Sequence, residues 1–175
     1  MNKDIIRKQM LLKRKEINDK EKISTIIVDK IINLDIYKKS KVVALYNSLN
    51  NEVDTKYLIN KSLKEKIVLL PRIIDNQIVF IEINNNTKYE KSNIGVLEPI
   101  GKEYLGNIDL IIVPGVSFDR KRNRLGFGMG YYDKYLDNKN IYKIGIGFNE
   151  QLIDELPVDK YDIKMDLIIT EKELI

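Results

Sequence analysis

Short apolar runs alternate with helical segments along the chain, and this alternation limits the folds it can adopt. Buried strands are expected at residues 41–46 (KVVALY), 67–70, 77–83 (QIVFIEI), 108–113 (IDLIIV), 142–148 and 167–170. Helices are expected at residues 3–17, from Asp19 to about 34, from Asp54 or Thr55 to 63, and at 131–136. Strands that alternate with helices form βαβ units. We therefore predict one α/β domain over residues 1–175, with a largely parallel, Rossmann-like open sheet flanked by helices.

The helical periodicity also predicts which side chains face the core. In the first helix the apolar face would contain Ile5, Ile6, Met10 and Ile17, and the other positions Lys3, Arg7, Lys13, Arg14 and Lys15. In the second helix the inward side chains would be Ile23, Ile26, Ile27, Ile31 and Leu34, with Asp19 as the N-cap. Residues 84–99 are polar or rich in turn residues, so a loop is expected there.

Two missing residue types restrict the chemistry. The 175 residues include no cysteine and no histidine, which excludes thiolate nucleophiles, disulfides, Cys/His zinc sites and Ser-His-Asp triads. An enzyme of this composition must use carboxylates, lysine, arginine, tyrosine, hydroxyls, backbone amides or an oxygen-bound metal such as Mg²⁺. The formal net charge of +4 favours anionic partners, either nucleic acid or small phosphate-bearing molecules.

The sequence also bears on location. Charged residues occur throughout the first turns, so no signal peptide is expected, and no apolar run approaches the roughly 20 residues that cross a bilayer. We therefore expect a cytoplasmic protein with no membrane partner. No obligatory protein partner is evident from the sequence.

Residues 114–136 (PGVSFDRKRNRLGFGMGYYDKYL) carry the strongest functional signal, because they lie between a clear strand and a helix. Gly126, Gly128 and Gly130 would let the backbone adopt positive φ and approach a ligand, so that exposed amides form an anion-binding nest. The cations expected beside this nest are Arg120, Lys121, Arg122 and Arg124. Asp133 follows closely and could hold Mg²⁺ against bound phosphates.

Other interpretations of this segment stay open. The spacing fits neither the Walker A nor the G-x-G-x-x-G pattern, so the glycines could form only a tight structural connection. The aromatic residues between them loosely suggest an RNA-recognition strand, whose rings stack on bases. That motif requires a strand, and alternating glycines disfavour one. A related ATP-using or sugar-phosphate enzyme is a further possibility.

Residues 113–136 resemble the signature segment of the 5-formyltetrahydrofolate cyclo-ligases, also called methenyltetrahydrofolate synthetases. Further elements follow in the family's order: KDIIR at 3–7, NEVDT at 51–55, LLPRI at 69–73, EP at 98–99 and MDLIITE at 165–171. The resemblance extends over essentially the whole chain. It implies ATP-dependent cyclisation of 5-formyltetrahydrofolate to 5,10-methenyltetrahydrofolate through a phosphorylated formyl oxygen, with release of ADP and phosphate.

The resemblance also implies the site residues, with Mg²⁺ as cofactor, ATP as co-substrate and no nucleic-acid partner. ATP would be bound by Lys3, Asp4, Ile5, Ile6, Arg7, Arg124, Leu125, Gly126, Phe127, Gly128, Met129, Gly130, Tyr131 and Tyr132. The folate would be bound by Asn47 and Glu52, and Mg²⁺ by Asp133 and Asp166. No residue is assigned a chemical step, but Arg124 and Tyr132 would position the reactants and neutralise charge.

Several of these residues have structural alternatives. From the sequence alone, Lys3 and Arg7 could lie on a solvated helix face, Asn47 and Glu52 in a turn, and Asp166 in a local hydrogen bond. Two positions depart from the family. Met129 stands where the family often has Gly or Lys, and Tyr161-Asp162 stands where it often has His-Asp.

Overall fold

A computed structural model, which describes residues 2–93 and 95–175, has a central six-stranded sheet. Its spatial order is β11 (Leu167–Ile169), β9 (Tyr142–Ile146), β6 (Leu110–Pro114), β1 (Val42–Ala44), β2 (Ile67–Ile74) and β3 (Gln77–Ile83). Neighbouring strands are parallel except β2 and β3, which form an antiparallel hairpin. Asp75 and Asn76 connect that hairpin and both have positive φ, as the favoured two-residue hairpin turns require. The predicted α/β fold with a largely parallel sheet is confirmed.

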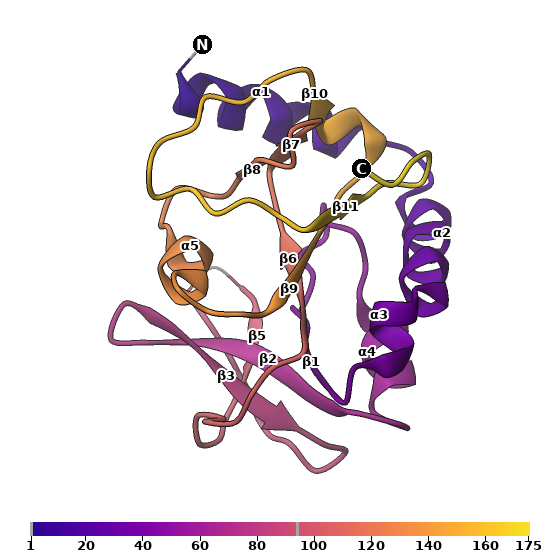
Figure 1. Cartoon of the computed structure of the whole chain (residues 1–175), viewed down its shortest axis with the longest axis vertical. Helices are drawn as coiled ribbons and strands as arrows, with labels where there is room; N and C mark the ends of the chain where they lie inside the picture. Colours follow the sequence, from indigo (N-terminus) through magenta and orange to yellow (C-terminus); the bar gives the residue numbers. More distant parts are fainter. Residues whose placement is uncertain (1, 94) are drawn as a thin grey trace.

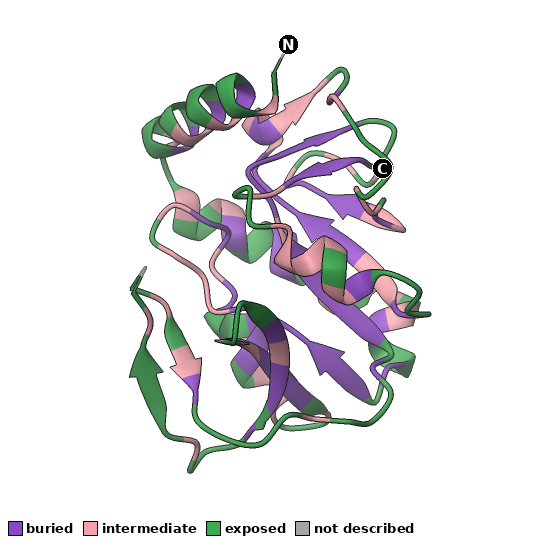
Figure 2. Cartoon of the chain, turned by 90° about the vertical axis from the view of Figure 1, so that its left-hand side faces the viewer, coloured by how far each residue is buried: buried purple, intermediate pink, exposed green. Residues whose placement is uncertain are grey.

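Helices cover both faces of this sheet (Figure 1). Three of them, α2 (Lys20–Asn33), α3 (Asp35–Lys39) and α4 (Lys56–Ser62), lie on one side, and α5 (Tyr131–Leu136) lies on the other. Successive side chains of a strand point to opposite faces, and β1 follows this rule. Val43 packs in the cluster beneath α2 and α4, whereas Val42 and Ala44 belong to the cluster beneath α5. The central strands are buried on both faces (Figure 2), which explains their continuous apolar sequences.

The first helix, α1 (Lys3–Glu16), packs against a separate small sheet. That sheet has the order β10 (Leu152–Ile153), β7 (Ser117–Asp119) and β8 (Arg124–Leu125), with the short 3₁₀ helix η1 (Asn149–Gln151) before it. Ile6 and Met10 of α1 contact a cluster that includes Val116 and Leu125. Because Leu125 directly precedes the glycines, this packing places the N-terminal helix beside the glycine segment.

Several local predictions are wrong. Ile5 and Ile26 are exposed, whereas Arg14, predicted on the polar side of its helix, is buried. The predicted loop over residues 84–99 contains the hairpin β4 (Tyr89–Lys91) and β5 (Leu97–Pro99); Ile94 lies outside the described residues. The composition of residues 84–99 gave no sign of these short strands. β4 is exposed at every position, so its sequence shows no alternation of apolar and polar residues. Asp19 is the N-cap of α2 as predicted, although its side chain makes no capping bond. Within the described residues, no helix is both long and apolar enough to cross a membrane.

Candidate functional site

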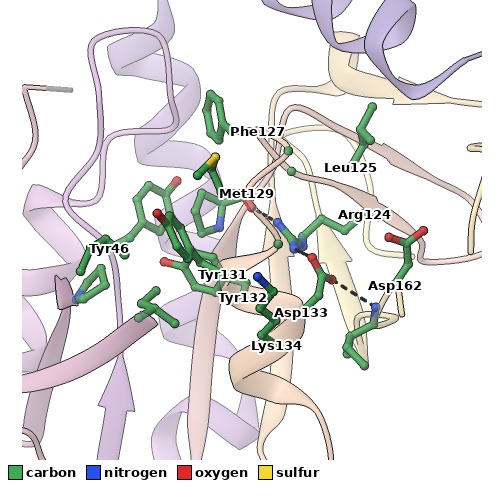
Figure 3. A pocket seen from close by; sticks show the side chains of 18 of the residues that line it. Tyr46, Arg124, Leu125, Phe127, Met129, Tyr131, Tyr132, Asp133, Lys134 and Asp162 are labelled. Atoms are coloured by element: carbon green, nitrogen blue, oxygen red, sulfur yellow. Dashed lines mark hydrogen bonds and ion pairs between the residues drawn. The ribbon is translucent and has the colours of Figure 1, made fainter. Parts of the chain in front are cut away.

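A pocket of about 900 Å³ opens where β1 and β6 end. Tyr46 and Asn47 follow β1, Pro114 ends β6, and all three line the pocket. This is the carboxyl edge of the parallel sheet, at which open α/β folds bind ligands. Figure 3 shows tyrosines gathered on one side of the pocket and the Arg124–Asp133 pair on the other. The pocket therefore has an aromatic side and a charged side.

The glycine loop, residues 126–130, forms one wall and leads into α5. Gly128 and Gly130 have φ values of +107° and +66°, in the region that favours glycine. Gly126 does not require positive φ, contrary to expectation; its carbonyl accepts a 2.9 Å bond from Arg7 Nε. The loop is not a strand, so the strand that the RNA-recognition interpretation requires is not formed.

Only some of the predicted cations reach the pocket. Lys3, Arg7 and Arg124, which were predicted to bind ATP, line it. The other three cations of the basic segment are engaged elsewhere: Arg120 pairs with Glu173, Lys121 pairs with Glu155, and Arg122 donates to the Asp166 carbonyl. The prediction that all four cations of residues 120–124 lie beside the loop is therefore wrong. β8 directs Arg124 into the pocket, whereas the turn before β8 leaves the other three cations outside the pocket.

Arg124 and Asp133 form a buried ion pair at the start of α5. Arg124 Nη2 lies 2.8 Å from Asp133 Oδ2, and the two side chains are only 4% and 18% exposed. The guanidinium also lies over the Tyr132 ring, 5.6 Å from its centroid. Asp133 Oδ1 accepts a bond from the Ile163 amide, so this carboxylate connects the glycine loop to the segment before β11.

An Arg124→Met substitution is expected to destabilise the fold by about 3 kcal/mol, because it leaves the Asp133 charge buried without its partner. The matched control is Arg120→Met, since Arg120 and Glu173 also form an ion pair but are far more exposed, at 58% and 34%. That control should cost less than about 1 kcal/mol. Urea unfolding of both variants measures the difference. Equal losses would show that the buried pair does not stabilise the protein.

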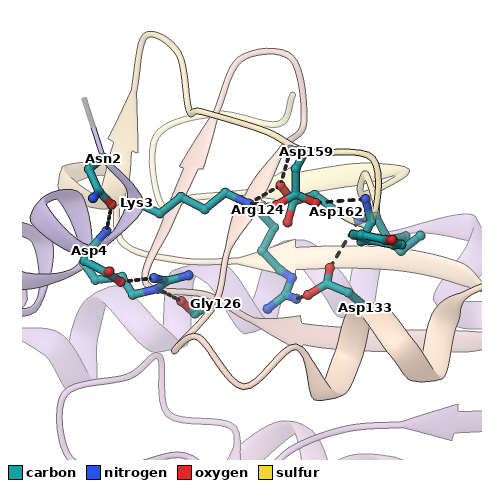
Figure 4. A network of polar contacts seen from close by, with 11 residues as sticks. Asn2, Lys3, Asp4, Arg124, Gly126, Asp133, Asp159 and Asp162 are labelled. Atoms are coloured by element: carbon teal, nitrogen blue, oxygen red, sulfur yellow. Dashed lines mark hydrogen bonds and ion pairs between the residues drawn. The ribbon is translucent and has the colours of Figure 1, made fainter.

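Lys3 is held at the pocket by two carboxylates of the segment before β11 (Figure 4). Its ammonium lies 2.8 Å from Asp159 Oδ2 and 2.5 Å from Asp162 Oδ2. Partial burial lowers the pKa of Lys3, but the hydrogen bonds and charges of Asp159 and Asp162 outweigh this and raise it above its ordinary value. Both Lys3 and Asp162 line the pocket. An anionic ligand that contacts Lys3 would therefore compete with two resident carboxylates.

The remaining N-terminal residues of the predicted ATP site lie outside the pocket lining. Asp4 is exposed and pairs with Arg7, and Ile5 faces solvent. Ile6 is buried in the cluster beneath Leu125. Only Lys3 and Arg7, one helical turn apart, present side chains to the pocket from this part of α1. From the glycine segment, all predicted ATP contacts from Arg124 to Tyr132 line the pocket.

The two predicted folate contacts, Asn47 and Glu52, also line the pocket. Asn47 Nδ2 donates a 2.8 Å bond to the Leu97 carbonyl and so connects the turn after β1 to β5. Glu52 is 8% exposed, and its Oε2 accepts a 2.8 Å bond from the Leu49 amide. Burial raises the pKa of Glu52 above its ordinary value, while the Leu49 amide and the charge of Arg14 oppose this.

The tyrosines near Glu52 are neutral hydrogen-bonding groups. Burial, followed by the charge of Glu52, raises the pKa of Tyr46 and that of Tyr132 well above the usual range. The Tyr46 hydroxyl donates to the Val53 carbonyl, which fixes its ring at the pocket wall. Tyr132 packs edge-on against Phe80 of β3. These contacts hold an aromatic wall around the one strongly buried carboxylate of the pocket lining.

The two predicted metal ligands, Asp133 and Asp166, are not brought together. Asp166 is absent from the pocket lining, and its Oδ2 accepts bonds from the amide and the ammonium of Lys143. This places it at the amino ends of β9 and β11, whereas the pocket opens at the carboxyl edge of the sheet. Asp133 alone lines the pocket. No cluster of three or more potential metal-binding side chains occurs in residues 2–93 and 95–175.

Sequence reasoning missed two further parts of the pocket lining. One is apolar and comes from the β2–β3 hairpin and the residue before β5, with Ile73, Ile78 and Val96. The other is residues 159–163, which include Asp162. The departure at Tyr161-Asp162 drew attention to this second segment, but only the fold brings it against α1.

The arrangement suits a ligand with an anionic part and a flat heterocyclic part. Lys3, Arg7, Arg124 and the glycine loop can neutralise phosphate charge at one end. At the other end, a buried carboxylate among aromatic rings can accept N–H donors from a heterocycle. No cysteine or histidine is available, so the site would act through positioning and charge neutralisation.

Comparison with known proteins gives a consistent result. Residues 1–171 match the model of the 5-formyltetrahydrofolate cyclo-ligase family. The 5-formyltetrahydrofolate cyclo-ligase of Mus musculus is 31% identical, over 85% of this chain and 82% of the mouse protein. That of Mycoplasma pneumoniae is 34% identical, over 98% of this chain and 100% of its own length.

Solved structures agree. The 5,10-methenyltetrahydrofolate synthetase of Aquifex aeolicus superposes with a TM-score of 0.89 at 36% identity and covers 99% of this chain and 92% of its own. The Mycoplasma pneumoniae 5,10-methenyltetrahydrofolate synthetase superposes with a TM-score of 0.76 at 31% identity and covers 98% of this chain and 99% of its own.

Proposed function

Because the chain belongs to the 5-formyltetrahydrofolate cyclo-ligase family, we propose that it converts 5-formyltetrahydrofolate and ATP into 5,10-methenyltetrahydrofolate, ADP and phosphate. One pocket, lined both by the cationic glycine loop and by the buried Glu52 carboxylate, supports this proposal. The two groups suit the two substrates, and their presence in one cavity suits a direct transfer between them.

The folate is proposed to bind at the aromatic end. A pterin ring presents an amino group and a ring N–H along one edge, and the Glu52 carboxylate can accept both donors. The Leu49 amide fixes Oε2 of this carboxylate. Tyr46 and Tyr132 provide apolar walls, and Asn47 stands at the neighbouring turn. We propose that this end orients the formyl group on N5 towards the glycine loop.

The triphosphate of ATP is proposed to bind at the cationic end. Gly128 and Gly130 turn the backbone so that amides can face phosphate oxygens, and no Cβ atom blocks their approach at those two positions. Arg7 and Arg124 neutralise charge from two sides, and the Asp133 pair keeps Arg124 in place. Met129 carries no charge, so the loop itself contributes backbone contacts and leaves the cationic role to these arginines and Lys3.

The proposed chemistry then requires no protein nucleophile. The formyl oxygen on N5 attacks the γ-phosphorus, its O–P bond forms, and ADP leaves. N10 attacks the activated formyl carbon and loses its proton to solvent. The C–O bond breaks and phosphate departs with the former formyl oxygen, which leaves the methenyl bridge between N5 and N10. The protein contributes alignment of the formyl oxygen with the γ-phosphorus and neutralisation of phosphate charge.

We propose that Mg²⁺ accompanies ATP and that Asp133 is its protein ligand. Enzymes that bind nucleotides usually hold Mg²⁺ through one or two carboxylates together with the substrate phosphates, so an all-protein cluster is not required. Asp133 fits this arrangement because its carboxylate lines the pocket beside the glycine loop. Asp166 does not fit, since Lys143 engages its carboxylate away from the pocket. When bound, Mg²⁺ would neutralise charge on the phosphates.

Asp133→Asn is expected to raise the Mg²⁺ concentration needed for half-maximal rate by at least about tenfold, because the ion loses a charged ligand. Asp166→Asn, the matched control, should leave this concentration within about twofold of the unmodified protein. Initial rates at saturating ATP across a Mg²⁺ titration give both values. The reverse pattern, with Asp166→Asn impaired and Asp133→Asn normal, would contradict the assignment.

Asp159 and Asp162 would compete with phosphate for the Lys3 ammonium. Asp162→Asn removes a charge that holds Lys3 away from phosphate, so ADP should bind about two- to fivefold more tightly in the absence of divalent ions. Calorimetric titration in EDTA measures this, which separates the effect from metal binding. Asp137→Asn is the control, because Asp137 lines the same pocket without bonding Lys3. Weaker ADP binding to Asp162→Asn would show that the Lys3–Asp162 pair helps to build the phosphate site.

The test of the proposed function is a direct assay. Purified protein, 5-formyltetrahydrofolate and MgATP should produce the absorbance of the methenyl bridge together with one equivalent of ADP, and a mixture without ATP should produce neither. If the protein binds ATP and gives no methenyl product, the folate assignment is wrong. If it binds no ATP, the assignment of the glycine loop is wrong as well.

A further inference from the structure

Tyr161 is an aromatic residue of the pocket lining to which the proposed reaction gives no role. It is 70% exposed, whereas Tyr46 of the same lining is 3% exposed. A single exposed aromatic residue is ordinary on a protein surface, but one that lines a pocket can stack on a flat ligand. Tyr161 therefore offers an aromatic face that a bound heterocycle could cover.

A tight turn, Asp159–Asp162, presents the Tyr161 ring. The Asp162 amide donates a 3.2 Å bond to the Asp159 carbonyl, so Lys160 and Tyr161 are the two central residues of the turn. The Tyr161 amide donates a 2.9 Å bond to Asp159 Oδ1. The Lys160 ammonium lies over the Tyr161 ring, 4.7 Å from its centroid. A cation thus covers one face of the ring, while the high exposure of Tyr161 leaves the other face accessible.

The C-terminal end of this turn is attached to the proposed phosphate site (Figure 4). Asp162 Oδ2 lies 2.5 Å from the Lys3 ammonium. The next amide, that of Ile163, donates a 3.2 Å bond to Asp133 Oδ1. Tyr161 therefore lies within two residues of contacts to Lys3 and Asp133, which the proposed function places at the phosphates and at Mg²⁺.

The direction of the triphosphate also favours this position. The γ-phosphate must face the formyl group of the folate, so the nucleoside at the other end of the triphosphate extends away from the folate. Figure 3 shows Tyr46, which belongs to the proposed folate site, and Asp162 on opposite sides of the glycine loop. Tyr161 directly precedes Asp162 and so lies on the side that the nucleoside would reach.

Phe127, which is also exposed and lines the pocket, is less suited to hold the base. It lies between Gly126 and Gly128, in the part of the glycine loop proposed to bind phosphate through its backbone. A base stacked on Phe127 would therefore occupy the space in which the loop amides meet phosphate.

We propose that Tyr161 is the platform for the nucleobase of ATP: the base stacks on the ring face opposite Lys160, while the triphosphate extends to Lys3 and the glycine loop. Stacking uses the π-face that every base presents, so the ring would add affinity for the nucleoside without reading the edge of the base. The inference rests on the proposed function, because it gives a place to the base of the ATP that this function requires.

The experiment compares Tyr161→Leu, which removes the ring, with Tyr161→Phe, which keeps it. Dissociation constants of ADP and of inorganic pyrophosphate are measured by calorimetry at one fixed Mg²⁺ concentration, because pyrophosphate has two linked phosphate groups but no nucleoside. Tyr57→Leu is the matched control, since Tyr57 is 53% exposed and lies in α4, outside the pocket lining. Unfolding in urea reports the stability of each variant.

Loss of the ring should affect ADP alone. Tyr161→Leu should weaken ADP binding about five- to twentyfold, the loss expected for one base–aromatic contact at an exposed position. Its pyrophosphate affinity should stay within about twofold of the unmodified protein, and Tyr161→Phe and Tyr57→Leu should keep both affinities within the same limit.

A fluorescent variant gives an independent readout. The chain has no tryptophan, so Tyr161→Trp introduces a single indole at the proposed platform. Stacking of adenine on this indole should quench its fluorescence when ADP binds, whereas pyrophosphate should leave the fluorescence unchanged. An indole signal that does not respond to bound ADP would contradict the proposal, even if Tyr161→Leu failed to fold.

Other outcomes also overturn the proposal. Equal weakening of ADP and pyrophosphate in Tyr161→Leu would show that the turn supports the phosphate site through Lys3. Unchanged ADP affinity would place the base elsewhere, and weaker binding of 5-formyltetrahydrofolate alone would place the folate on this ring. Unmodified protein that binds ADP no more tightly than pyrophosphate would remove the base site but leave the proposed function intact. Unmodified protein that binds neither would contradict the proposed function itself.

Discussion

A Gly128→Val variant is expected to lose nucleotide binding and turnover by a factor of about 100 or more while keeping its fold, since a close phosphate contact is worth several kcal/mol. Gly128 has a φ of +107°, which a β-branched residue adopts only with strain, and the new side chain would stand where phosphate must approach the backbone. Its Cβ would lie 3.5 Å from the Arg7 guanidinium, so the added bulk also faces a pocket cation. ADP titration and steady-state rates measure the loss.

The control for this variant is Gly95→Val, which imposes similar strain elsewhere. Gly95 has a φ of +87° and lies between β4 and β5, outside the glycine loop. Both variants should lose about 1–3 kcal/mol of unfolding free energy from backbone strain, but only Gly128→Val should lose ADP binding. Equal ADP affinities in the two variants would contradict a backbone phosphate site in residues 126–130.

Glu52→Gln is expected to weaken 5-formyltetrahydrofolate binding about 10- to 100-fold, because a hydrogen bond to a charged acceptor contributes about 1.5–3 kcal/mol. The amide keeps the shape of the side chain but replaces one acceptor oxygen with a donor, which would oppose the amino edge of a pterin. ATP binding should change little, because within the described residues Glu52 bonds the Leu49 amide and none of the residues assigned to ATP. Separate titrations with each ligand distinguish the two effects.

A second carboxylate of the pocket lining provides the control for Glu52→Gln. Asp137→Asn removes a carboxylate that also lines the pocket but is exposed, so folate affinity should change by less than about threefold. If Glu52→Gln weakens ATP as much as folate, Glu52 supports the whole pocket. In that case the division into a folate end and a phosphate end is wrong.

The fold could be predicted from the sequence because the apolar runs of the central strands indicate strands buried on both faces of a sheet. Residues 110–113 form a continuous apolar run that ends at Pro114-Gly115, which is typical of a strand buried on both faces. The two short antiparallel strands, β4 and β5, could not be predicted in the same way. Their residues are mostly polar or exposed, so neither apolar alternation nor length distinguishes them from a loop.

The glycine loop could also be predicted, because its glycines and the polar residues beside them follow one another in the sequence. Residues 124–133, to which the resemblance assigns ATP and metal contacts, all line the pocket. The partners of its neighbours were not predictable in this way. Whether Arg120 or Arg124 faces the pocket depends on the turn before β8, which pairs Arg120 with Glu173, 53 residues away.

Contacts between distant segments account for the remaining differences. Arg14 resembles the other basic residues of its helix, and only the packing of α1 on the small sheet buries it. Asp166 lies in an element that resembles the family, yet the register of β9 and β11 places its carboxylate on Lys143. Lys3 pairs with residues more than 150 positions later, which no local pattern could indicate.

Transfer of the formyl oxygen to phosphate within this pocket can be followed with an oxygen isotope. 5-Formyltetrahydrofolate labelled with ¹⁸O in the formyl group is converted with unlabelled MgATP in unlabelled water, and the released phosphate is analysed by mass spectrometry. Phosphorylation of the formyl oxygen predicts one ¹⁸O atom in each phosphate. Unlabelled phosphate formed together with the methenyl product would contradict the account, because it would show that ATP is hydrolysed without activating the formyl group.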